Sequence, residues 1–125
     1  MSRRRKETSC IVSRAAALDH APVFAALGDG TRLLLLGKLS AGQPRSITEL
    51  AADSTLTRQA ITKHLRVLEN AGLVSGERRG REILFQFTPE PIQEATEYLE
   101  HVSLQWDRTL QRLRLLVEST SDKAT

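Results

Sequence analysis

The stretch Thr57-Arg-Gln-Ala-Ile-Thr-Lys-His-Leu-Arg-Val-Leu-Glu-Asn-Ala-Gly-Leu-Val74 decides the fold, because it contains a helix and the point where the helical period ends. Its large apolar residues recur at steps of four and three, which predicts one buried stripe along a helix. They are Ile61, Leu65 and Leu68. Thr57 is a suitable N-cap, and Gly72 can adopt the left-handed conformation that ends a helix while Leu73 packs back.

A second, shorter helix is predicted just before this one. Ser46-Ile-Thr-Glu49 matches the capping box, in which the serine oxygen and the glutamate carboxylate each bind a free backbone amide. We expect this helix to place Leu50 and Ala51 inward and to end around Ser54. Two short helices separated by a tight turn indicate a helix-turn-helix.

The period changes to about two after Gly72, which predicts a β-hairpin. Its strands are expected at residues 73–78 and 82–87, with the turn at Arg79-Gly80-Arg81. A hairpin of two strands is marginal alone and must pack against the helices.

Two further helices are predicted on the N-terminal side. The first begins near Asp19, with Pro22 in its first turn. The second is capped by Asp29 and runs through Leu33-Leu-Leu-Leu36 and Leu39 to a stop near Gly42. Since it is apolar on all sides, we expect this second helix to be buried.

A long last helix, about residues 90–118, carries an apolar seam that repeats near every 3.5 residues. The seam includes Leu99, Val102, Trp106, Leu110 and Leu113. The preceding domain is too small to cover it, so a second copy of the chain is the simplest partner. Two alternatives are a helix folded back over its own domain and, for Trp106, a wall of a small-ligand pocket.

The predicted fold is therefore mostly α with a small β-hairpin, a winged helix-turn-helix with a long C-terminal dimerisation helix. The expected organisation is a flexible basic arm at residues 1–14, a DNA-binding domain at 15–88, the dimerisation helix at 89–119 and a flexible tail at 120–125.

The helix that begins after Thr57 has an outward face suited to a DNA groove, with forked, amide, hydroxyl and cationic groups and no carboxylate. The predicted contacts on it are Thr57, Arg58, Gln59, Thr62, Lys63 and Arg66. The alternative is an ordinary solvated face. The hairpin turn favours DNA, because Arg78, Arg79 and Arg81 lie where a basic wing reaches flanking phosphates or a minor groove.

Composition excludes several other classes of protein. The chain has 125 residues, enough for one domain, and a net charge of +3. Residues 1–41 carry +4, residues 42–88 carry +2 and residues 89–125 carry −3, so the predicted arm and DNA-binding domain are basic and the dimerisation helix is acidic. One cysteine, Cys10, excludes an intramolecular disulfide framework. With no signal peptide and no membrane-spanning run, the cytoplasm is the expected compartment, and no membrane is expected as a partner.

Several segments together resemble the ArsR/SmtB family of winged-helix repressors. They are Phe24-Ala-Ala-Leu-Gly-Asp-Gly-Thr-Arg32, Ile47-Thr-Glu-Leu-Ala51, Ala60 through Val74, and Arg79-Gly-Arg81. The resemblance covers about residues 20–118 and implies a dimer, an operator with two-fold symmetry in double-stranded DNA, and release from DNA on sensing an unidentified inducer.

The chain departs from the metal-sensing members of that family. The first helix of the helix-turn-helix contains no thiol, and the last helix has a lone His101. We therefore expect no metal site and no cofactor. Cys10 is expected to be incidental, with a redox sensor as the alternative. His64 is expected to pack or contact phosphate, with a ligand or a pH switch as the alternative.

Other classes of function are weaker. No catalytic constellation or phosphate-binding glycine loop is present in the sequence, so an enzyme is not expected. The competing hypothesis is a protein–protein interaction module that acts through its long amphipathic C-terminal helix.

Overall fold

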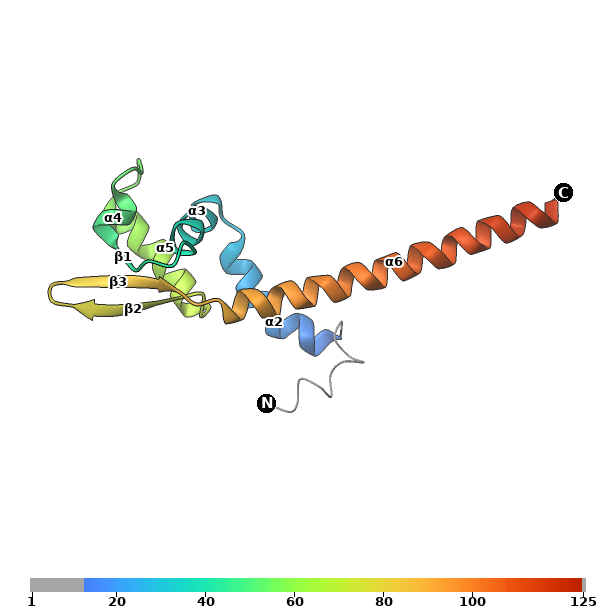
Figure 1. Cartoon of the computed structure of the whole chain (residues 1–125), viewed down its shortest axis with the longest axis horizontal. Helices are drawn as coiled ribbons and strands as arrows, with labels where there is room; N and C mark the ends of the chain where they lie inside the picture. The colour runs from blue at the N-terminus through green and yellow to red at the C-terminus, as the bar shows by residue number, and fades with distance from the viewer. Residues whose placement is uncertain (1–12, 125) are drawn as a thin grey trace.

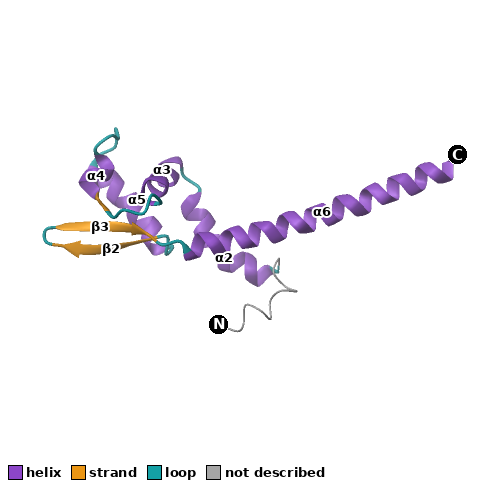
Figure 2. Ribbon diagram, in the orientation of Figure 1, coloured by secondary structure: helices purple, strands orange, loops and turns teal. Residues whose placement is uncertain are grey.

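The computed structural model describes residues 13–124 and contains five helices and three strands within that range (Figures 1 and 2). In chain order these are α2 (Arg14–Leu27), α3 (Gly30–Leu39), β1 (Arg45–Ser46), α4 (Ile47–Ala51), α5 (Arg58–Asn70), β2 (Val74–Arg79), β3 (Glu82–Phe87) and α6 (Glu90–Ala124). Residues 1–12 of the predicted arm, with Cys10, and the last residue of the predicted tail lie outside the described residues.

The arrangement confirms a winged helix-turn-helix with a long C-terminal helix. Helices α4 and α5 pack on each other, and both contact α3 or the sheet. Figure 1 shows the tip of the β2–β3 hairpin and the free end of α6 at opposite ends of the molecule. The two surfaces that the sequence predicts are thus far apart.

The core confirms the apolar stripe of α5. Ile61, Leu65 and Leu68 are each at most 1% exposed. They pack in one hydrophobic cluster with residues from α2, α3, α4, β2, β3 and α6. Its other large members include Leu35, Leu36, Leu39, Leu50, Leu73 and Phe85. Because this stripe is buried, the opposite face of α5 is turned to solvent.

Local caps hold the helix ends where the sequence predicts them. The Ser46 hydroxyl oxygen accepts from the Glu49 amide at 3.2 Å, and the Glu49 carboxylate accepts from the Ser46 amide at 2.9 Å. Gly72 has φ +80°, in the left-handed region, and the Leu73 amide donates to the Leu68 carbonyl oxygen at 2.9 Å.

The sheet has a third strand that the sequence analysis missed. The strand order is β1-β3-β2, with Arg45 opposite Phe85 and Ser46 opposite Leu84. Because β1 has only two residues, it leaves no alternating pattern to recognise. It anchors the hairpin to the start of α4, so the wing is tied to the helix-turn-helix.

Helix α2 begins at Arg14, so its predicted start near Asp19 is wrong, and so is the predicted position of Pro22 in the first turn. Ser13 is the N-cap, since its Oγ accepts from the Ala16 amide at 3.2 Å. The alanines at 15–17 favour a helix, and this preference extends it ahead of the proline. Arg14, predicted in the arm, is therefore helical.

Helix α3 is not buried all round as predicted. Leu35, Leu36 and Leu39 face the core, but Leu33 and Leu34 are 54% and 59% exposed. Neighbouring elements cover only one side of this helix, so the burial predicted from the run of four leucines was too extensive.

Helix α6 continues to Ala124, beyond the predicted boundary at residue 119, so residues 120–124 are helical rather than a separate tail. With 35 residues it is about 52 Å long. Its first turns belong to the domain core, because Ala95 is buried and Ile92 packs against the core cluster. None of the helices in the described part of the chain has the length and apolar character needed to cross a membrane.

We predict that Leu65→Ala lowers the free energy of unfolding by about 2–5 kcal/mol, because it opens a cavity beneath the centre of α5. Leu34→Ala, at an exposed leucine, should cost less than about 0.5 kcal/mol. Urea unfolding at one protein concentration measures both. Equal losses in the two variants would contradict the assignment of α5 as the central core helix.

Candidate nucleic-acid interface

The six residues predicted on α5 do share its outward side. Five are exposed and Thr62 is half-buried. The exposed ones are Thr57, Arg58, Gln59, Lys63 and Arg66. The buried stripe fixes this orientation, because a helix that buries one face must present the other.

Four of these residues line a shallow open groove of about 530 Å³ between α4 and α5. Its wall consists of Ile47, Arg58, Gln59, Thr62 and Lys63. The sequence analysis assigned Ile47 only to the start of a helix. Its position directly after the N-cap Ser46, at the end of α4 that faces α5, is the signal that would have included it.

The two threonine hydroxyls of this surface differ in what they can offer. Thr57 Oγ1 accepts from the Ala60 amide at 3.1 Å, so its own proton is free to be donated. Thr62 Oγ1 instead donates to the Arg58 carbonyl oxygen at 2.7 Å. A free hydroxyl proton at a helix N-terminus suits an anion, so Thr57 can still donate a hydrogen bond, whereas Thr62 offers mainly its methyl group.

The hairpin turn is shorter than predicted. Arg79 pairs with Glu82 at the ends of the strands, so only Gly80 and Arg81 form the loop. Gly80 has φ +62° and no residue other than glycine in the described chain has a positive φ. Glycine at the first loop position alone is typical of a type II′ turn.

The strand register separates the three arginines instead of clustering them. Arg78 lies opposite Ile83, and Arg79 lies opposite Glu82. Because side chains alternate along a strand, Arg78 and Arg79 point to opposite faces of the hairpin, with Arg81 at the tip.

Arg79 also has an acidic neighbour. Its Nη2 lies 3.6 Å from Glu77 Oε1, an exposed ion pair. Such a pair is weak, but together with Glu82 it reduces the positive potential on that face. Arg78 and Arg81 therefore keep more of their positive potential than Arg79 does.

One carboxylate close to the helix-turn-helix is neutralised locally. Asp53, just after α4, lies 2.8 Å from Lys38 Nζ. The hydrogen bond from the Lys38 side chain is the main cause that holds the pKa of Asp53 below its usual range. This pair connects α3 to the turn between α4 and α5.

The five residues predicted for a dimer seam lie far from this surface, along α6. Leu99, Val102, Trp106, Leu110 and Leu113 are between 36% and 58% exposed. Their spacing puts them on one face of α6, and this face continues the one that buries Ile92 and Ala95 against the domain. The described chain offers them no intramolecular cover.

No group of three or more His, Cys, Asp or Glu side chains in the described residues is arranged to hold a metal ion. The expectation that the protein senses no metal remains a prediction.

A solvated recognition helix with cations and an amide along it, next to a basic β-wing tied to the same core, defines a winged helix-turn-helix DNA-binding protein. The profile of the bacterial regulatory protein, arsR family, matches residues 29–75. The chain belongs to the ArsR family and is a DNA-binding transcriptional regulator.

Individual relatives agree with this assignment. The chain is 45% identical over 76 residues to YuzN of Bacillus subtilis (strain 168), an uncharacterized HTH-type transcriptional regulator, covering 56% of this chain and 83% of YuzN. An ArsR-like transcriptional regulator from Rhodococcus sp. RHA1 has a similar structure, with TM-score 0.71 and 35% identity over 82% of this chain and 95% of that one.

A second similar structure is a homodimeric winged helix-turn-helix DNA-binding domain from Mycobacterium bovis, a possible ArsR-family transcriptional regulator. Its TM-score is 0.57 at 28% identity, with 76% of this chain and 85% of that domain covered.

We predict that Thr57→Ala destabilises the domain by about 1 kcal/mol, because the first turn of α5 loses its side-chain cap. Thr57→Ser keeps the oxygen and should retain most of the stability. Urea unfolding, with hydrogen exchange of the Ala60 amide as a local probe, measures the difference. Equal loss in both variants would contradict the capping role.

Proposed function

We propose that the protein is a repressor that binds a two-fold symmetric operator as a homodimer and reads its sequence with α5. The observation that carries this proposal is the groove along α5, where Arg58, Gln59 and Lys63 are exposed beside one another. These groups match the donors and acceptors of base edges and phosphates in a major groove.

Within α5, the roles divide along the helix. Recognition helices contact bases with their N-terminal residues, so we assign base readout to Arg58 and Gln59. Arg58 has the fork that suits guanine, and Gln59 has the amide that suits adenine. Thr57, Lys63 and Arg66 are assigned to backbone phosphates, and the methyl group of Thr62 to a thymine methyl or sugar.

In the wing, Arg78 and Arg81 are assigned to the phosphates or minor groove beside each half-site. Arginine is favoured in a narrow minor groove because the negative potential is greatest there. Arg79 is the weaker wing contact because of Glu77.

The homodimer is proposed to form along the seam of α6. Five large apolar side chains on one face of a solvated helix are costly to leave in water, and a second copy offers a matching surface. Arg114 and Glu118 lie beside Leu110, Leu113 and Val117, as flanking charges do beside a paired-helix seam. The similar domain from Mycobacterium bovis is homodimeric, which supports a homodimer here.

A two-fold dimer requires two half-sites, with centres about 10 bp or a multiple of that apart. We propose that an inducer releases the protein from DNA and that the protein acts on the chromosome in the cytoplasm. It includes no catalytic activity, since the site residues serve binding alone.

We predict that Arg58→Ala or Gln59→Ala costs about 1–3 kcal/mol on the preferred operator and relaxes sequence choice at one or two positions. Arg81→Ala should weaken binding to every duplex alike and reduce the salt slope by about one. Selection from randomised duplexes identifies the operator. The affinity of each variant for the operator and for a scrambled duplex is then measured at several salt concentrations. Identical patterns for the two classes of variant would contradict this division of roles.

We predict that Trp106→Asp gives monomers, because it buries a charge in the centre of the proposed seam. Sedimentation velocity measures the oligomeric state. Leu104→Asp is the matched control, since Leu104 is also exposed but lies on the opposite face of α6. A dimeric Trp106→Asp variant would place the interface elsewhere.

A further inference from the structure

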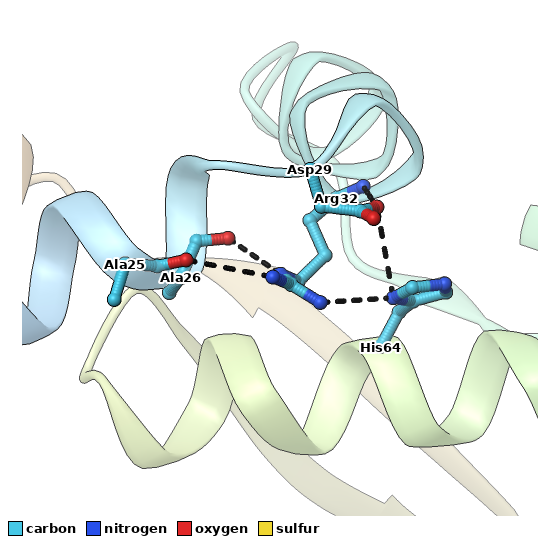
Figure 3. A network of polar contacts seen from close by, with 5 residues as sticks. All are labelled: Ala25, Ala26, Asp29, Arg32 and His64. Carbon is cyan, nitrogen blue, oxygen red and sulfur yellow. Dashed lines mark hydrogen bonds and ion pairs between the residues drawn. The ribbon is translucent and has the colours of Figure 1, made fainter.

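A polar cluster on the inner flank of α5 connects three helices (Figure 3). The Arg32 guanidinium of α3 donates from Nε to the Ala26 carbonyl oxygen and from Nη2 to the Ala25 carbonyl oxygen, at 3.4 Å. Its Nη1 lies 3.3 Å from Nδ1 of His64, which is in the middle of α5. One side chain thus joins the last turn of α2 to α5.

The positive charge of Arg32 is unfavourable at the start of its own helix, α3, and favourable at the end of α2. Asp29 is the N-cap of α3, so Arg32 lies in the first turn, where the helix dipole disfavours a cation. The carbonyl oxygens of the last turn of α2, by contrast, are partly negative, and that of Ala25, which accepts from the Gly28 amide at 3.3 Å, has a second lone pair to offer. Arg32 therefore caps α2 from the start of α3, and its planar fork reaches α2 and α5 together.

The chemistry of the guanidinium limits how Arg32 can contact His64. A guanidinium only donates hydrogen bonds, so Nη1 of Arg32 donates to Nδ1 in the tautomer whose Nδ1 carries no proton. Asp29 Oδ2 lies 3.8 Å from the same Nδ1. The Arg32 amide is the main cause that lowers the pKa of Asp29, and attraction to His64 and the Arg32 side chain adds to it.

This contact is separate from the outward face of α5. The His64 side chain is 24% exposed, and its Nδ1 points to Arg32 rather than to solvent (Figure 3). Its sequence neighbour Lys63 is exposed and lines the groove. His64 therefore acts between α5 and the rest of the domain.

We propose that Arg32 and His64 are positioning residues, which hold the recognition helix at the angle at which Arg58 and Gln59 reach base edges. The proposal rests on the proposed function of α5. Apolar packing of Ile61, Leu65 and Leu68 is non-directional, so it keeps α5 in place without fixing its rotation. A directional hydrogen bond from a guanidinium held at two carbonyl oxygens supplies that restraint.

The consequence is a distinctive pattern of binding. Base contacts require accurate placement, whereas attraction to phosphates depends mainly on charge. Loss of the Arg32–His64 contact should therefore weaken specific binding more than non-specific binding. A variant that merely destabilised the fold would reduce both in proportion.

The test compares operator and scrambled duplexes for His64→Ala, His64→Asn and the control His101→Asn, which changes the histidine of α6. Asparagine places an acceptor oxygen at the same side-chain position as Nδ1. We expect His64→Ala to lose about tenfold in operator affinity, as for one charge-assisted hydrogen bond, with the scrambled duplex within about twofold. His64→Asn should recover most of the loss, with the salt slope unchanged.

A second arm tests whether the two residues act together. In an Arg32→Lys background, which lacks the fork, His64→Ala should have little further effect on operator affinity. Additive losses would overturn the proposal. Equal losses on both duplexes in His64→Ala would also overturn it, and a salt slope reduced by about one would show a phosphate contact instead.

A third arm needs no DNA, so it separates this inference from the proposed function. Hydrogen exchange in the free protein should be about tenfold faster for the α5 amides in His64→Ala, close to wild type in His64→Asn, and unchanged in the first turns of α6. If the wild type binds no duplex, the proposed function fails while this arm still decides the contact. Unchanged exchange in α5 would overturn the positioning role.

Discussion

Burial of one apolar stripe on α5 is the constraint on which the rest of the structure depends. Ile61, Leu65 and Leu68 occupy the centre of a cluster drawn from α3, α4, β2 and β3. Because these three side chains have to be excluded from water, the helix can present only its other side to solvent. The exposure of Arg58 and Gln59 is thus a consequence of the core. The hairpin follows from the same packing, since Leu73 and Phe85 complete the cluster and direct the strands past the end of α5.

The apolar face of α6 is covered by its own chain only near the start of the helix. Near its start the apolar face meets α2 and the core, where Ala95 is buried. From Leu99 onward the same face runs past the edge of the domain and is uncovered. A helix of about 52 Å exceeds what a single small domain can cover. The uncovered length therefore follows from the length of the helix.

Local chemistry was predictable from the sequence, and long-range contacts were not. Ser46 and Thr57 at N-caps and Gly72 at a helix end each depend on neighbours within four residues, and all three were located correctly. The strand β1 and the partial exposure of α3 depend on which segments meet in space, so no local period reveals them. The candidate site divides in the same way. The face of α5 followed from a helical period, whereas the separation of Arg78 from Arg79 required the strand register.

The position of α2 relates the two proposed surfaces to each other. Two of its aromatic side chains pack in tilted arrangements on Tyr98 of α6, with ring centroids 5.0 Å apart for His20 and 6.5 Å apart for Phe24. Its last turn, a few residues later, binds Arg32 and through it His64 (Figure 3). Affinity for a symmetric operator depends on the spacing and angle of two recognition helices. A change in how two copies of α6 meet would therefore reach α5 through α2. In the proposed dimer, a ligand that changes the packing of α2 on α6 would therefore alter DNA binding without contacting the DNA-facing residues.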